Sequence, residues 1–227
     1  MEIDDLINNL QPSRKPIKTG SQEDTYLKDD LRLLKQAWTS ERMAPELLPF
    51  VGSLLDRIME RIRRQVQFIE ENSVDLRPGT DIKMQLLIVE SELERIKFLV
   101  RGYLRCRLTK IDKYSMYFLR NESAAKRLSP QEKRYMQRHQ TMLQGLYKDQ
   151  FLESFPESLQ TLDDTAGGIS MIEEPDLDKA VCIRVLENVE RPIPVGGVDM
   201  ELKKGCIYMV RYSAILRDLS ERSVELV

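Results

Sequence analysis

Nucleophilic catalysis by a Ser-His or Cys-His arrangement needs a histidine, and this 227-residue chain has only one. Its single histidine, His139, would have to belong to any Ser-His-Asp or Cys-His catalytic set. His139 lies in a polar stretch of a predicted helix, where a solvated or locally hydrogen-bonded role is the more frequent one. The three cysteines, Cys106, Cys182 and Cys206, are far apart and form no CxxC pair. They are expected to be small buried side chains, so no structural metal is predicted.

Phosphate-binding glycine motifs are also missing, since neither GxxxxGK[ST] nor GxGxxG occurs. The glycine pairs at 167–168 and 196–197 are expected to belong to a linker and a turn. Acidic pairs such as Glu70-Glu71 and Asp163-Asp164 flank predicted elements, which is typical of solvated helix ends. The sequence therefore predicts a protein with no catalytic residues, cofactor or metal.

One predicted helix has an unusual charge pattern. Acidic residues occupy its first half and basic residues its second half, as the helix dipole favours. The basic residues are Lys97, Arg101, Arg105, Arg107, Lys110 and Lys113. Arg101, Arg105 and Arg107 could contact acidic groups of this chain or a partner, or nucleic-acid phosphate. Structural or interchain pairing is the favoured interpretation.

Composition supports that choice. Lys and Arg number 35 against 37 Asp and Glu, which gives a formal charge of −2, whereas dedicated nucleic-acid-binding domains are usually strongly basic. Charged residues make up 32% of the chain, which suits exposed helices carrying ion pairs. No apolar run is long enough for a transmembrane helix, and the acidic start MEIDDLINNL does not resemble a signal peptide.

Apolar residues recur at helical spacing through most of the chain. A first helix is expected from Leu27 to the proline-rich run 44–49, and a second from Val51 to before Arg77. A third, with an apolar stripe of about seven turns, starts near residue 80 and reaches Ile111. Ser129-Pro130-Gln131-Glu132 matches a capping box and begins a fourth helix to about residue 149. A short helix is predicted over 151–162.

After residue 165 the apolar period changes from 3.6 to 2. Strands are predicted at 181–186, 198–202 and 206–210, with a turn-rich loop at 191–197, a short helix at 214–219 and a terminal strand at 224–227. The predicted fold class is α+β, with a mostly α-helical bundle domain followed by a small β-rich domain. The expected boundaries are a flexible tail 1–24, a helical domain 25–165, a linker 166–177 and a β-rich domain 178–227.

Four segments resemble the Sld-type subunit of the eukaryotic GINS complex, especially its fungal members. They are AWTSERMAPELLPF (37–50), ELERIKFLVRGYLRCRLTKID (92–112), EEPDLDKAVCIRV (173–185) and LKKGCIYMVRYSAI (202–215). The resemblance implies a nuclear, non-catalytic subunit of a tetramer of four related chains, with a helical A domain before a β-rich B domain. It also implies that the tetramer joins the Mcm ring and a Cdc-family recruitment factor in the replicative helicase, where the Mcm ring is the ATPase.

The N-terminal tip resembles a peptide by which fungal members of that family bind a trimeric Ctf-family adaptor. In such helix-in-groove binding, apolar residues at helical spacing insert into the groove and acidic residues lie near the helix N-terminus. The resemblance assigns these contacts to Ile3, Asp4, Asp5, Leu6, Ile7 and Leu10.

The apolar stripe of the long helix is expected to pack partly within the chain and partly against a sister subunit. The residues assigned to this seam are Leu93, Ile96, Val100, Tyr103 and Leu104, with Trp38 as a core or interface anchor. Two alternatives remain: nucleic-acid binding by the basic half of the helix, and an enzyme that would require His139 in a buried pocket.

Overall fold

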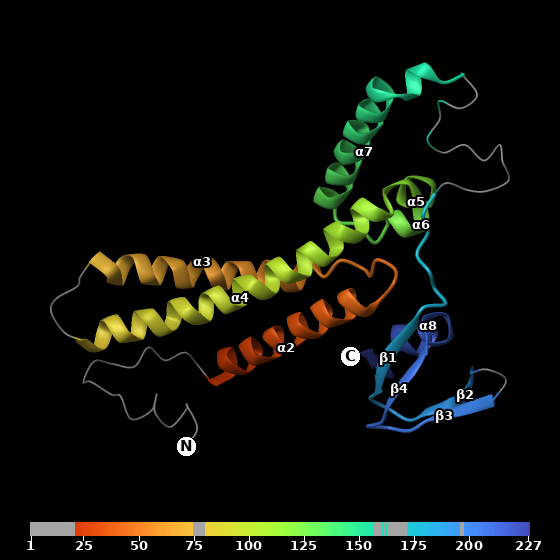
Figure 1. Ribbon diagram of the computed structural model, residues 1–227. Helices are drawn as coiled ribbons and strands as arrows, with labels where there is room; N and C mark the ends of the chain where they lie inside the picture. Colours follow the sequence, from red (N-terminus) through yellow and green to blue (C-terminus); the bar gives the residue numbers. More distant parts are fainter. Residues whose placement is uncertain (1–20, 75–79, 157–159, 161, 163–171, 196–197) are drawn as a thin grey trace.

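The computed structural model describes residues 21–74, 80–156, 160, 162, 172–195 and 198–227. It has a long helical part followed by a small β-rich part (Figure 1), which is the predicted α+β order. Residues 1–20, and with them the predicted adaptor peptide, lie outside the described residues. The helical elements are α2 (Ser21–Met43), α3 (Gly52–Val74), α4 (Thr80–Lys113), α5 (Ser115–Arg120), α6 (Glu122–Ala125), α7 (Pro130–Gln150) and the 3-10 turn η1 (Leu152–Ser154).

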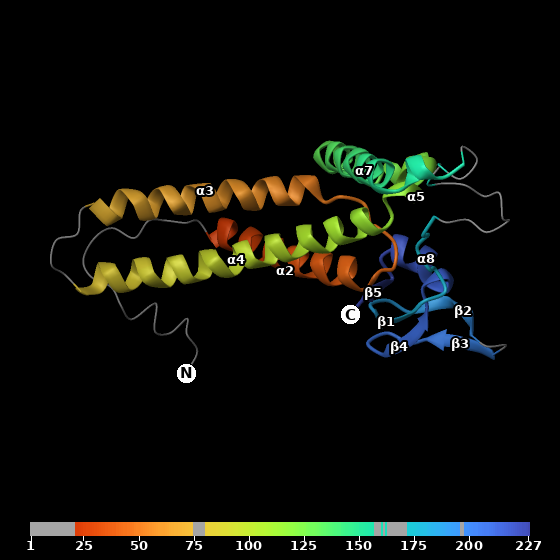
Figure 2. The ribbon, with the colours of Figure 1, turned by 45° about the horizontal axis from the view of Figure 1, so that its top comes forward.

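The helices α3 and α4 form a long antiparallel hairpin, and α2 lies along α4 (Figures 1 and 2). All three contribute to one apolar core, as the predicted stripes require. The helix α2 begins at Ser21, so residues 21–24, predicted to belong to the tail, are helical.

The capping box that begins α7 is present as predicted. The Glu132 amide donates to Ser129 Oγ at 3.2 Å, and the Ser129 amide donates to Glu132 Oε2 at 2.8 Å. The predicted helix over 151–162 is wrong in the described part of that range, which contains only η1. Pro156 explains the early end, because the residue before a proline is driven to extended backbone, and Phe155 has ψ of 159°.

The β-rich part contains a three-stranded antiparallel sheet in the order β4-β1-β5 and a separate two-stranded sheet β2-β3. Its elements are β1 (Ala180–Val185), β2 (Val189–Val195), β3 (Val198–Leu202), β4 (Ile207–Arg211), α8 (Tyr212–Ser220) and β5 (Val224–Leu226). The predicted strands and the short helix are confirmed within one or two residues.

The predicted loop at 191–197 is wrong for residues 191–195, which belong to β2. Prolines at 192 and 194 suggested a loop because proline cannot donate to a strand ladder. A two-stranded sheet consists only of edge strands, where proline is tolerated, and the pairing is irregular between Val189 and Ile193.

Candidate functional site

The predicted seam of α4 packs mainly within this chain. Leu93, Val100 and Tyr103 are buried in the core shared with α2 and α3. Ile96 and Leu104 are partly buried against the same core. Most of the apolar stripe of α4 is therefore used for packing within this chain.

Trp38 lies where α2 crosses α4, and its position depends on a glycine. A Cβ atom added to Gly102 would come within 3.1 Å of the Trp38 ring. The ring also contacts Phe98 edge to face, with centroids 6.1 Å apart, although Phe98 itself is largely exposed. Trp38 is thus half-buried between the core and an exposed aromatic residue on α4.

A cluster of buried charges joins α2, α4 and α7. The Arg107 guanidinium is 0% exposed and donates to Glu132 at 2.7 and 3.0 Å and to Glu41 at 3.0 Å. Its two remaining N–H groups donate to the carbonyls of Leu48 and Arg127, at 2.6 and 3.0 Å. All five guanidinium donors are therefore used inside the chain.

The cluster holds its charges in spite of burial. Burial is the largest single influence, lowering the pKa of Arg107 and raising that of Glu132. The hydrogen bonds and charge attraction within the cluster together outweigh it, so the net pKa shift is upward for Arg107 and downward for Glu132. Lys110 donates to Glu41 Oε1 at 2.8 Å, and burial lowers the pKa of Lys110. Glu132 is also the capping-box residue of α7, so one carboxylate starts that helix and fixes it to α4.

The three arginines predicted to contact acidic groups or phosphate do not form one surface. Arg107 is withdrawn from solvent, and its acidic partners lie in its own chain. Arg101 is exposed and pairs with Glu94 at 3.0 Å, while Arg105 is exposed. A phosphate contact through Arg107 is therefore excluded in this fold, and only Arg101 and Arg105 remain accessible.

His139 stacks on Tyr135 with ring centroids 5.9 Å apart, and its Nδ1 lies 3.7 Å from an Asp112 oxygen. That oxygen accepts a hydrogen bond from the Tyr135 hydroxyl at 2.9 Å.

Within the described ranges, no group of His, Cys, Asp or Glu is arranged to hold a metal ion. None of the helices described is long and apolar enough to cross a membrane.

Two apolar surfaces protrude from the helical part. The hairpin-tip surface lies toward the free end of the α3–α4 hairpin, which extends past the start of α2 (Figures 1 and 2). Its exposed members are Phe68, Met84, Leu87 and Ile88. The α7 surface covers the half of α7 that projects away from α4 and the turn after it (Figure 1). Its exposed members are Met142, Leu146, Tyr147, Phe151 and Phe155.

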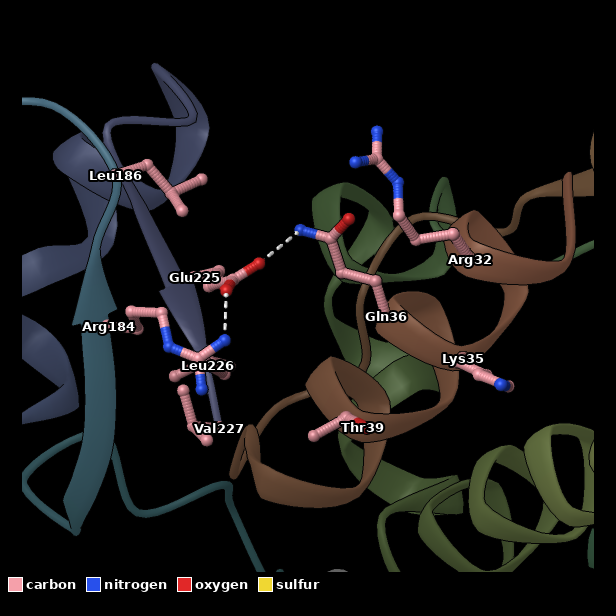
Figure 3. A pocket seen from close by; sticks show the side chains of 9 residues that line it. All are labelled: Arg32, Lys35, Gln36, Thr39, Arg184, Leu186, Glu225, Leu226 and Val227. Atoms are coloured by element: carbon pink, nitrogen blue, oxygen red, sulfur yellow. Dashed lines mark hydrogen bonds and ion pairs between the residues drawn. The ribbon is translucent and has the colours of Figure 1, made fainter. Parts of the chain in front are cut away.

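The helical and β-rich parts share a junction at the α2–α3 connection. Ala44 is buried within the β-rich core, and the Tyr212 hydroxyl donates to Glu46 at 2.9 Å. A crevice of about 500 Å3 lies beside this junction, and in Figure 3 the side chain of Gln36 on α2 reaches Glu225 on β5 across it, while Arg184 pairs with Glu225 from the neighbouring strand β1. The crevice is lined by Arg32, Lys35, Gln36 and Thr39 of α2 and by Arg184, Leu186, Glu225, Leu226 and Val227.

Comparisons with known proteins match both parts. The family described as "GINS complex protein helical bundle domain" matches residues 59–151, and "DNA replication complex GINS protein SLD5 C-terminus" matches residues 175–227. A protein of Yarrowia lipolytica named "DNA replication complex GINS protein SLD5" is 42% identical over 95% of this chain and 81% of its own length. The chain belongs to the SLD5 family of GINS subunits. A Chaetomium globosum protein of the same name is 40% identical over 100% of both chains, and one of Saccharomyces cerevisiae is 37% identical over 84% and 77%.

SLD5 membership confirms the resemblance and makes the chain a non-catalytic subunit of the GINS DNA replication complex. The sequence interpretation did not identify the hairpin-tip surface, although a signal was present. Met84, Leu87 and Ile88 form a second apolar row at i, i+3 and i+4, beside the main stripe of α4. A helix with apolar residues around most of its circumference is buried on more than one side.

Proposed function

We propose that this SLD5 chain is a structural subunit that binds three sister GINS subunits through the hairpin-tip and α7 surfaces. The GINS tetramer would act in the initiation and elongation of chromosomal DNA replication, in the nucleus, as part of the replicative helicase with the Mcm ring and a Cdc-family factor. One observation carries the assembly proposal: the chain has its own apolar core, yet large apolar side chains are exposed on two protruding helical elements.

Exposure on this scale favours binding to other proteins. Leu87 is 64% exposed and Met142 66% exposed, and each has apolar neighbours at helical spacing on its own helix. Contiguous exposed apolar side chains are uncommon on monomeric proteins and mark interaction sites. Helices that project from the body of a subunit can contact a neighbour without disturbing the intrachain core.

Co-expression with the three sister subunits tests this proposal. We expect Leu87→Asp and Met142→Asp to reduce the yield of the 1:1:1:1 complex, measured by light scattering after size exclusion. The matched controls are Gln85→Asp and Gln144→Asp, which add the same charge at exposed polar positions of the same helices. Unchanged yield with both apolar variants, or equal losses with the controls, would refute these interfaces.

The N-terminal tip is proposed to bind a trimeric Ctf-family adaptor. Its support is the helical spacing of the apolar residues at positions 3, 6, 7 and 10, with polar residues between them, which fits an amphipathic helix in a groove. A fluorescent peptide of residues 1–20 should bind the purified adaptor, and Ile3→Ala with Leu6→Ala should abolish binding, whereas Asn9→Ala should not. If the peptide with both Ile3→Ala and Leu6→Ala binds as tightly as the peptide with Asn9→Ala, the assignment is refuted.

The alternative, nucleic-acid binding, now depends on Arg101 and Arg105. Arg105 is exposed and has no acidic partner among the ion pairs of the described residues. Binding through these residues would weaken with salt and fall when both are replaced by Gln. Salt-independent retention on a DNA column, or retention unaffected by the double variant, would rule it out.

A further inference from the structure

The strand β4 has a free edge in the β-rich part. The sheet order β4-β1-β5 puts β4 at one side, and among the described strands only β1 pairs with it. Edge strands expose unpaired N–H and C=O groups that can pair with a strand of another chain. The other edge strand, β5, has only three residues and packs beside α2, where Gln36 Nε2 donates to Glu225 at 3.0 Å, so it offers no comparable free edge.

Two hydrogen bonds show which backbone groups of β4 point outward. The Val185 amide donates to the Cys206 carbonyl at 3.1 Å, and the Tyr212 amide donates to the Lys179 carbonyl at 3.0 Å. In an antiparallel ladder the residues that bond to the neighbouring strand alternate. The even-numbered residues of β4 therefore bond to β1, and the N–H and C=O groups of Ile207, Met209 and Arg211 point away from it.

Those outward residues also carry exposed apolar side chains. Ile207 is 59% exposed and Met209 68% exposed, whereas the alternate residue Val210 is buried in the core. Proteins usually protect an edge strand with a charged side chain, a proline or a bulge in its middle. The middle of β4 has none of these, and its pairing with β1 is regular.

Positive charge lies at both ends of this edge. Lys203 and Lys204 precede β4, and Arg211 ends it. All three are exposed, and none has an acidic partner among the ion pairs of the described residues. A segment that complements this edge along its whole length would be apolar in its middle and acidic at its two ends.

We infer that the free edge of β4 binds an extended segment of a partner protein that adds a strand to the sheet. The segment has apolar side chains at alternate positions, which contact Ile207 and Met209, and acidic residues at its ends, which contact Lys203, Lys204 and Arg211. Main-chain hydrogen bonds would supply the affinity, and the alternating side chains the specificity. This site is separate from the hairpin-tip and α7 surfaces.

The test uses the four-subunit complex containing this chain and a labelled peptide, Glu-Asp-Val-Thr-Val-Thr-Val-Asp-Glu, measured by fluorescence anisotropy. We expect binding that falls at least tenfold when the acidic residues are replaced by Lys. Two further peptides carry N-methyl groups on alternate amides, one set each. Strand addition predicts that one set binds and the other binds at least tenfold more weakly. Equal binding of the two sets, loss in both, or no binding of the parent peptide would overturn the inference.

Variants of the chain give a second readout. Met209→Pro removes an outward N–H without touching the bonds to β1, and Met209→Glu adds a charge that repels the peptide; each should weaken binding at least tenfold. Leu119→Glu is the control, since Leu119 is 48% exposed but lies on α5, outside the hairpin-tip and α7 surfaces. Hydrogen exchange should show that the peptide slows the amides of Ile207, Met209 and Arg211. Unchanged exchange there, or unchanged affinity of Met209→Glu, would contradict strand addition.

Discussion

Replacing Arg107 by Met should destabilise the helical part strongly, because it removes the central cation of a buried cluster. The methionine side chain has a similar length, so loss of packing is limited, but Glu132 and Glu41 lose the guanidinium. Glu41 keeps Lys110 at 2.8 Å, and Glu132 keeps only its capping-box bonds. Breaking a buried ion pair by removing one partner costs about 3–5 kcal/mol.

Urea unfolding followed by the fluorescence of Trp38, the single tryptophan, measures this loss. With a urea slope of about 2 kcal/mol per M, a loss of about 4 kcal/mol lowers the unfolding midpoint by about 2 M. The control is Arg101→Met, which removes an exposed pair with Glu94 and should cost less than about 1 kcal/mol. Adding Glu132→Gln to Arg107→Met should recover part of the loss, since it removes the stranded charge. An Arg107→Met midpoint equal to that of Arg101→Met would refute this account of the cluster.

Leu104→Asp should reduce the yield of the four-subunit complex more than the surface change Arg105→Asp does; equal yields by light scattering would refute the seam. Gly102→Val should cost about 1–3 kcal/mol in urea unfolding because its side chain meets the tryptophan ring, whereas Gly145→Val, with open space around it, should be nearly neutral. Burial raises the pKa of Glu132, but the hydrogen bonds and charge of Arg107 and the hydrogen bonds of Ser129 together lower it by more, so in the folded state this pKa lies below its ordinary 4.5. Its stabilisation is therefore present above pH 4.5 and lost as pH falls through the folded value, so acid unfolding of Glu132→Gln should depend less steeply on pH in this range.

The sequence predicted elements whose signals are local. The α7 start followed from Ser129 and Glu132, which are three positions apart and bond to each other in the structure. The long helix α4 was predicted from an apolar stripe that keeps the helical period throughout. The β2 strand was missed because prolines 192 and 194 disfavour a strand locally, while pairing with β3 provides the compensating contacts.

The burial of Arg107 could not be read from the chain. An arginine in a basic run of a helix looks solvated, and its partners Glu132 and Glu41 are 25 and 66 positions away. The same limit applies to the apolar stripe of α4, because a face that contacts α2 and α3 has the same pattern as one that contacts a sister subunit. Only the packing of the helices separates the two cases.

The junction at the α2–α3 connection means that the β-rich segment is not an autonomous folding unit. Ala44 completes its core, and Glu46 accepts the hydrogen bond of the buried Tyr212, yet both residues lie far from it in the chain. Residues 175–227 excised alone would expose the apolar surface that Ala44 covers and leave the Tyr212 hydroxyl without its acceptor. The intact chain should therefore absorb heat in a single calorimetric peak, its two parts melting together.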